Sequence, residues 1–522
     1  MSDEAAVNHS EIKDALGSIG LSTILILGAT FLSQGMGFVT RITMARYLPV
    51  NGYGSVVLGI SLLNLLGIFA LSGLPQALSR YIPRKDTDAK RRRVVASAFH
   101  VVFVLSIVLA AGTFLLAEPV SRVVFDNPDL VWVFRVFALA LPCYALFKLS
   151  IGGFRGYERT KPQVITDKVL LPGLQLVGIV AFVTFGYDTA GIAFAYAVAF
   201  ALVAVVSVGV VYRLGKFSVR DVVDGGSTGQ YRELLEFSVP LAASGAINTI
   251  AKHSDLVILG AFLSSSAVGL YEVSFRMSMF VVFLISPAVG YLFQPLISKY
   301  DAEADHQRME KLFTVTTRWI TVGTFPVFVL MFLFPEQTLV FFFSDEYTTG
   351  SLALRFLVLG SMITRIPGLT GAFLTAVGKT KTLMYISVAT AILNIAVNIV
   401  LIPTYGILGA AIATAGARVF NNLVQSIVIL RLFQLSPFNW EYLFPLSVIS
   451  AVVTAIFVSP LPLQSIDFIG GILVAGGIGV VYLLLIIATK SVYTVEVELL
   501  ERLLEKAGIS IPVSKVLQPF IR

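Results

Sequence analysis

Charged residues are scarce in this chain. Asp, Glu, Lys and Arg together make up 13% of its 522 residues, whereas 56% of the residues are hydrophobic. A soluble domain carries roughly 25% charged residues, and a soluble fold of this length could not keep so much apolar surface out of water. A lipid bilayer removes the difficulty, because it is itself an apolar solvent. The composition therefore excludes an ordinary soluble protein and predicts a membrane protein.

Cysteine and histidine are also rare. The single cysteine, Cys143, excludes an intrachain disulfide and a cysteine-based metal site. The four histidines, His9, His100, His253 and His306, are too scattered to predict a metal site. The sequence also lacks a phosphate-binding glycine loop and a paired metal-binding motif. We therefore expect no metal, no cofactor and no enzymatic activity.

The charge balance is basic, with a net charge of +7. No stretch between the apolar runs is long enough to form a domain that reads nucleic acid. Lys and Arg are instead expected in cytoplasmic loops, next to anionic lipid headgroups. Residues 1–21 lack the short apolar core of a cleavable signal peptide. The lipid bilayer, and not nucleic acid, is the partner that this balance predicts.

Apolar runs of about 18 to 25 residues recur along the chain, each long enough to span roughly 30 Å of hydrocarbon. They predict an all-α polytopic membrane protein with about fourteen transmembrane helices. Basic residues collect in alternate loops, as at Arg91 and Lys379, and acids in the others, as at Asp129 and Asp188. This alternation predicts a cell-membrane protein with both termini in the cytoplasm. We expect the spans at approximately residues 22–46, 55–79, 94–117, 130–152, 164–185, 190–213, 233–262, 267–292, 312–334, 351–375, 382–402, 406–432, 441–459 and 467–489.

Two short motifs repeat at similar spacing. The segment 187–193 resembles 405–411, with Gly191 matching Gly409 at an offset of 409 − 191 = 218, and 159–161 resembles 379–381 at an offset of 380 − 160 = 220. They predict a duplication into two parallel six-helix lobes around a central cavity. The predicted organisation is a polar cytoplasmic N-terminus at 1–21, an N-terminal six-helix lobe at 22–220, a cytoplasmic inter-lobe linker at 221–231, a C-terminal six-helix lobe at 232–435, helices 13 and 14 at 436–490, and an amphipathic cytoplasmic tail at 491–522.

Bases outnumber acids inside the predicted spans. An ionisable group there is costly and usually faces a cavity, a partner or the interface. Guanidinium groups bind phosphate bidentately, so a base-rich set predicts a phosphate or pyrophosphate cargo. Snorkelling to the headgroups is the alternative for Arg46, Arg135 and Arg355, which lie near span ends. The predicted phosphate-binding cavity residues are Arg41, Arg46, Arg135, Arg276, Arg355, Arg365 and Arg418.

A second cluster lies on the predicted seventh span. Lys252 and Asp255 are three residues apart and share one helix face, so a structural ion pair is one interpretation. The other is a coupling or gating site formed by Lys252, His253 and Asp255, because a histidine can change its charge near neutral pH. The prolines inside the spans, among them Pro75 and Pro367, predict helices that bend between inward- and outward-open states.

Three segments resemble a known family. Residues 45–48 with Gly52-Tyr53-Gly54, residues 73–81 and residues 255–260 resemble the Wzx-type polysaccharide flippases of the multidrug/oligosaccharidyl-lipid/polysaccharide exporter superfamily, which are related to the MurJ lipid II flippases. The resemblance implies alternating access that moves a polyprenyl-(pyro)phosphate-linked oligosaccharide from the cytoplasmic to the outer leaflet, for surface glycan or glycoprotein biosynthesis. Arg46 matches the arginine of the first-helix motif. Arg41 is shifted by one position from the matching arginine of MurJ-like sequences.

The resemblance also names partners and alternatives. Glycosyltransferases or a ligase of the same pathway are candidate partners. A cation- or proton-coupled multidrug antiporter of the same superfamily is the first alternative, although it should present acids to its cavity. A membrane glycosyltransferase would need a larger extramembrane loop than this chain has. A non-transporting assembly subunit would not need buried charges.

Overall fold

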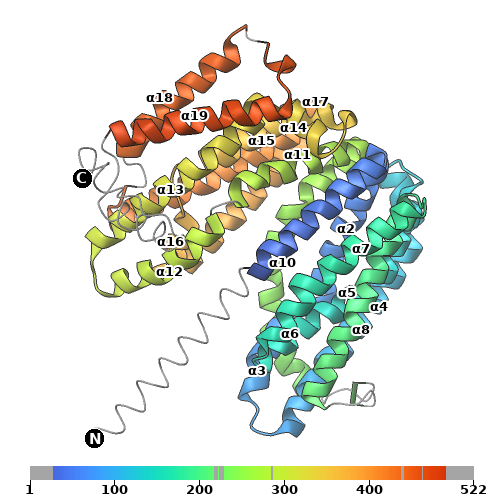
Figure 1. Cartoon of the computed structure of the whole chain (residues 1–522). Helices are drawn as coiled ribbons and strands as arrows, with labels where there is room; N and C mark the ends of the chain where they lie inside the picture. Colours follow the sequence, from blue (N-terminus) through green and yellow to red (C-terminus); the bar gives the residue numbers. More distant parts are fainter. Residues whose placement is uncertain are drawn as a thin grey trace, which may run out of the picture. The chain divides into compact units, whose positions relative to one another are not determined.

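The computed structural model describes residues 28–216, 221–222, 228–283, 286–436, 440–460 and 462–489 (Figure 1), and all regular structure in these ranges is helical. The chain divides into two compact units, Met1–Gly269 and Leu270–Arg522, which are described here one at a time. The predicted N-terminus at 1–21 and tail at 491–522 lie outside the described residues, as does 223–227 of the predicted linker.

The apolar helices confirm an all-α polytopic membrane protein. In the described part of the chain, eight helices are long and apolar enough to cross a membrane, or nine when a bent pair over residues 229–262 is counted as one span. One of the eight, Thr380–Phe433, contains two predicted spans, because the backbone is non-helical at Gly406 (φ 60°, ψ −136°). The total of about fourteen spans stays a prediction.

The first unit is built around one central helix, α5 (Leu130–Gly156), which packs against α2, α3, α4 and α8. Its small residues allow close contact, since a Cβ at Gly152 would collide with the backbone of Pro75. The unit also contains a helix over residues 28–47, then α2 (Val50–Leu71), α3 (Leu74–Arg84), α4 (Asp88–Pro119), the π-helix η1 (Val120–Val124), α6 (Thr160–Val164), the π-helix η2 (Ile165–Leu170), α7 (Leu171–Thr184), α8 (Thr189–Gly215) and α10 (Thr228–Phe262).

The second unit has α13 (His306–Leu333) at its centre, in contact with α12, α15, α18 and α19. Phe325 on α13 and Tyr482 on α19 are both fully buried, and their ring centroids lie 4.8 Å apart. The unit's other elements are α11 (Ser265–Phe283, its first turn belonging to the first unit), α12 (Ser286–Ala302), α14 (Pro335–Phe342), η3 (Asp345–Gly350), α15 (Ser351–Ile363), α16 (Thr370–Ala376), α17 (Thr380–Phe433), α18 (Trp440–Val458), η4 (Leu463–Ser465) and α19 (Phe468–Ala488).

Two predicted spans are broken rather than merely bent. The span predicted at 55–79 divides into α2 and α3 at Gly73, and the span predicted at 351–375 divides into α15 and α16 beside Gly368. Both glycines have φ of +73°, a left-handed conformation that a residue with a Cβ rarely adopts. Pro75 therefore lies at the start of α3, where a helix tolerates proline, and Pro367 lies between two helices.

Candidate functional site

The break between α2 and α3 borders a cavity inside the first unit. The cavity has a volume of ≈ 310 Å³, and its walls include Asn64, Gly73, Gln76, Tyr144, Lys252 and His253. The Tyr144 hydroxyl donates a hydrogen bond of 3.2 Å to the Asn64 side-chain oxygen. Polar groups from α2, α3, α5 and α10 thus line one cavity of the first unit.

The structure places two of the three predicted coupling residues at this cavity. Lys252 is exposed on its wall, and His253, 9% exposed, lies with Nδ1 3.3 Å from Ser61 Oγ. Asp255 is 5% exposed, and its carboxylate accepts a hydrogen bond from the Leu256 backbone N–H at 3.0 Å. A titratable ring and a carboxylate two residues apart in a buried helix segment suit either a structural or a coupling role.

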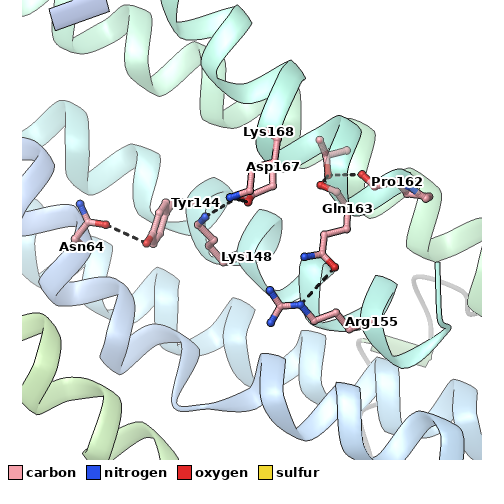
Figure 2. A network of polar contacts seen from close by, with 9 residues as sticks. Asn64, Tyr144, Lys148, Arg155, Pro162, Gln163, Asp167 and Lys168 are labelled. Carbon is pink, nitrogen blue, oxygen red and sulfur yellow. Dashed lines mark hydrogen bonds and ion pairs between the residues drawn. The ribbon is translucent and has the colours of Figure 1, made fainter. Parts of the chain in front are cut away.

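A second polar group lies further along α5, and Figure 2 shows its members. The Lys148 ammonium on α5 lies 3.1 Å from one oxygen of Asp167, and the Lys168 ammonium lies 2.8 Å from the other. Asp167 and Lys168 are on the π-helix η2, a form that often occurs at functional sites. We call these three residues the Lys–Asp–Lys triad. The sequence prediction missed both lysines, although their positions inside two apolar runs were a usable signal.

The second unit gathers three of the predicted arginines. Arg276 on α11 pairs with the buried Glu272 at 2.5 Å, one helical turn away. The Arg418 guanidinium on α17 lies 4.8 Å from the ring centroid of Phe275 and donates a hydrogen bond of 3.3 Å to Ser361 Oγ. Arg365 lies in the turn after α15, 365 − 361 = 4 residues beyond Ser361, and donates a hydrogen bond of 3.4 Å to Thr364 Oγ1, so both guanidinium groups lie near the end of that helix.

The other predicted arginines lie in different surroundings. Arg135 lies 3.9 Å from the Glu118 carboxylate and over the rings of Phe114 and Trp132. These contacts, at the start of α5, favour the interfacial interpretation.

Arg355 likewise lies near a helix start and donates a 3.1 Å hydrogen bond to the Phe332 carbonyl. Arg41 donates to the Gly37 carbonyl at 3.1 Å, and Arg46 is exposed near the end of the helix over residues 28–47. The phosphate-binding role of these residues stays a prediction.

Arg318 is a further base that the sequence prediction overlooked. It lies on α13 and is 3% exposed, although it falls inside the span predicted at 312–334. No group of three or more His, Cys, Asp and Glu residues in the described ranges is arranged to hold a metal ion. The first unit therefore offers a cavity lined by a lysine and a histidine, and the second unit offers guanidinium groups that can bind anions.

Comparison with known proteins gives two family matches. The model of the family described as polysaccharide biosynthesis protein matches residues 19–301, more than half of the chain, and the MatE model matches residues 240–400. A probable low-salt glycan biosynthesis flippase, Agl15 of Haloferax volcanii, is 25% identical over 432 residues, which cover 80% of this chain and 86% of that protein.

Solved structures show the same fold. Lipid II flippase MurJ in an inward closed conformation aligns with a TM-score of 0.71 at 16% identity, over 88% of this chain and 98% of MurJ. An inward-facing multidrug resistance MATE family transporter aligns with a TM-score of 0.62 at 17% identity, over 79% of this chain and 98% of that one.

Proposed function

The chain belongs to the polysaccharide biosynthesis protein family, and from this membership we propose that it is a flippase for lipid-linked glycans. Its substrate is a polyprenyl-phosphate- or pyrophosphate-linked oligosaccharide, which it moves from the cytoplasmic to the outer leaflet of the cell membrane by alternating access. The termini lie in the cytoplasm. The glycan serves surface polysaccharide or glycoprotein synthesis, and the enzymes that build or transfer it are the candidate partners.

The pair Arg365 and Arg418 is the observation that carries this proposal. Arg418 on α17 contacts Ser361 near the end of α15, and Arg365 lies in the turn that follows that helix, so two guanidinium groups occupy this region and repel each other. An anion bound between them converts the repulsion into two attractions. Phosphate and pyrophosphate fit this role, because their oxygens accept the parallel N–H bonds that a guanidinium group donates.

Arg276 and Glu272 suit the same role. Arg276 projects one helical turn beyond its carboxylate partner and keeps 30% of its side chain exposed. The partner offsets one charge without covering the guanidinium group. The Arg418 guanidinium lies over the ring of Phe275 and donates a hydrogen bond to Ser361 Oγ, and these two contacts restrict its side chain. Pre-oriented donors of this kind bind an anion with less loss of side-chain entropy.

The experiment that tests the proposal is deletion of the gene. A membrane-impermeant glycan probe applied to intact cells and to inverted vesicles then reports the leaflet that holds the lipid-linked glycan. We expect the glycan to accumulate on the cytoplasmic face while surface glycan disappears, and the wild-type gene should restore both. An unchanged leaflet distribution would contradict the flippase assignment.

An ion-coupled multidrug antiporter is the second candidate. The match of the MatE model to residues 240–400 and the buried pair His253 and Asp255 favour it. This candidate expects cells without the gene to become sensitive to cationic dyes, and His253→Ala to reproduce that sensitivity. The flippase proposal expects neither result, so dye efflux in the deletion strain separates the two.

A further inference from the structure

The Lys–Asp–Lys triad (Lys148, Asp167 and Lys168) carries more positive than negative charge. Each oxygen of the single carboxylate accepts one ammonium group, at 3.1 Å from Lys148 and 2.8 Å from Lys168. Figure 2 shows Asp167 between the two lysines. Two ammonium groups and one carboxylate give this arrangement a formal net charge of +1.

The triad lies about two helical turns from the ends of its helices and near the cytoplasmic ends of the spans predicted at 130–152 and 164–185. Lys148 precedes the end of α5 by 156 − 148 = 8 residues, and Asp167 follows the start of α6 by 167 − 160 = 7 residues. At 1.5 Å per residue these separations place the charges roughly 10–12 Å from the helix ends. An uncompensated charge at such depth is costly and marks a substrate or ion pathway more often than a structural site.

The two lysine side chains are more exposed than the carboxylate that they share. Each lysine side chain is 34% exposed, whereas the Asp167 side chain is 16% exposed. The lysines are therefore more accessible to an approaching anion than Asp167 is. Lys148 also follows Tyr144 by one helical turn, so both project from one face of α5, and Tyr144 lines the cavity of the first unit.

We propose that the Lys–Asp–Lys triad is an anion-exchange site, at which the phosphate or pyrophosphate of a lipid-linked substrate displaces Asp167 from the two lysines on its way to the cavity. This inference rests on the proposed flippase function. On the predicted topology the loop between α5 and α6 is cytoplasmic, so the triad lies on the side where the substrate is loaded. Asp167 keeps the lysines extended and hydrated while no substrate is bound.

The chemistry favours a phosphate over a sugar as the group that is recognised. In a lipid-linked glycan the phosphate is esterified at both ends, so a single phosphate carries about one negative charge and a pyrophosphate about two, and the pyrophosphate in particular competes with a single carboxylate for two ammonium groups. Neutral hydroxyl groups could not break two charge-assisted hydrogen bonds. An anionic phospholipid headgroup shares the phosphate chemistry, and the experiment therefore separates it from the substrate.

Binding to the purified full-length protein tests the inference without a transport assay. The protein is placed in nanodiscs of phosphatidylcholine and titrated with farnesyl pyrophosphate as a short polyprenyl probe. Each lysine can donate a charge-assisted hydrogen bond to the probe, so Lys148→Met and Lys168→Met should each weaken binding about tenfold. Asp167→Asn should strengthen binding several-fold, because it removes the competing anion.

Control variants separate this role from a structural one. Lys148→Arg keeps the charge and should retain binding, and Lys161→Met removes an exposed base of α6 and should change nothing. If Asp167 served only to hold the helices together, Asp167→Asn would lower the melting temperature. It would also weaken binding of the probe, as the lysine variants do. That pattern would overturn the inference.

Two further results would also overturn it. The first is unchanged binding in both lysine variants; if Arg365→Ala and Arg418→Ala then still weakened binding, the proposed function would survive the loss of the triad. The second is tenfold weaker binding of phosphatidylglycerol in the lysine variants with no change for farnesyl pyrophosphate, which would make the triad a site for bulk lipid. Failure of the flippase proposal itself would appear in the leaflet distribution of the deletion strain.

Discussion

The two units contain similar broken helices with different chemistry beside them. In the first unit, Gly73 separates α2 from α3, and the break lines a cavity with Lys252 and His253. In the second unit, Gly368 follows Pro367 between α15 and α16, three residues after Arg365. Both glycines have φ of +73°. A left-handed glycine therefore lies beside a cavity that contains a histidine in one unit, and near guanidinium groups in the other.

The difference between the units lies in how their intramembrane bases are balanced. In the first unit, Lys148 and Lys168 share the carboxylate of Asp167. In the second unit, the positive charge of Arg418 acts on the positive charge of Arg365. A lysine is a compact point charge that can move from one anion to another, whereas an arginine presents a fixed, planar set of donors. This contrast suits an exchange site in the first unit and a holding site in the second.

The largest effect is expected from the arginine pair. Arg365→Ala and Arg418→Ala should each lower flipping roughly 100-fold, because each removes a charged partner of the phosphate that is worth about 1.5–3 kcal/mol. The measurement is flipping of a fluorescent lipid-linked glycan in proteoliposomes, normalised to the amount of inserted protein. Arg431→Ala is the matched control, since Arg431 is an exposed base in the last turn of α17 and is not among the predicted phosphate-binding residues.

Normal flipping in both Arg365→Ala and Arg418→Ala would contradict a holding site in the second unit, and with it the contrast between the units. Arg418→Lys sharpens it further, because lysine keeps the charge but loses the planar stacking on Phe275. We expect that variant to fall between Arg418→Ala and the wild type.

Gly73 and Gly368 should differ in how much stability the protein loses when a methyl group is added. Gly73→Ala should destabilise the protein by about 3 kcal/mol, because the left-handed backbone is strained and the new Cβ would collide with the Ser238 backbone oxygen. Gly368→Ala should cost about 1–2 kcal/mol, because its first obstacle is the Thr317 side chain, which can move. Thermal unfolding in detergent measures both, and equal losses would contradict this ranking.

A double variant tests the cause of the smaller loss. Adding Thr317→Ala to Gly368→Ala removes the hydroxyl that the new Cβ would meet. It should recover part of the lost stability, although the strain of the left-handed backbone remains. The single Thr317→Ala variant provides the baseline. No recovery would show that backbone strain alone sets the cost at Gly368.

The smallest effect is expected at the cavity of the first unit. Tyr144→Phe removes the hydrogen bond to Asn64 but keeps the ring that packs on Phe200. The loss should be about 1 kcal/mol of stability, with flipping reduced only a few-fold, because a net hydrogen bond contributes about that much. Leu141→Ala on the same helix is the contrasting control, since a fully buried apolar side chain should cost more.

The sequence by itself determined the class of the protein. In lipid no water is present to form hydrogen bonds with backbone N–H and C=O groups. A long apolar run must therefore form these bonds within itself, as a helix does. The resemblance of residues 45–48 and 73–81 to Wzx-type flippases is confirmed by the family match over residues 19–301. The scarcity of intramembrane charge also directed attention to Arg365 and Arg418, which the structure brings together.

Only the tertiary structure decided which charges meet and where the helices break. Lys148 and Asp167 lie 19 residues apart and become partners because α5 packs against α6, the helix that η2 continues. Nor does the sequence distinguish a bend at Pro75 from a break at Gly73, because φ at a glycine is set by its neighbours. Hydropathy is a property of each segment and can be read locally, whereas the pairing of side chains depends on which faces of the helices pack together.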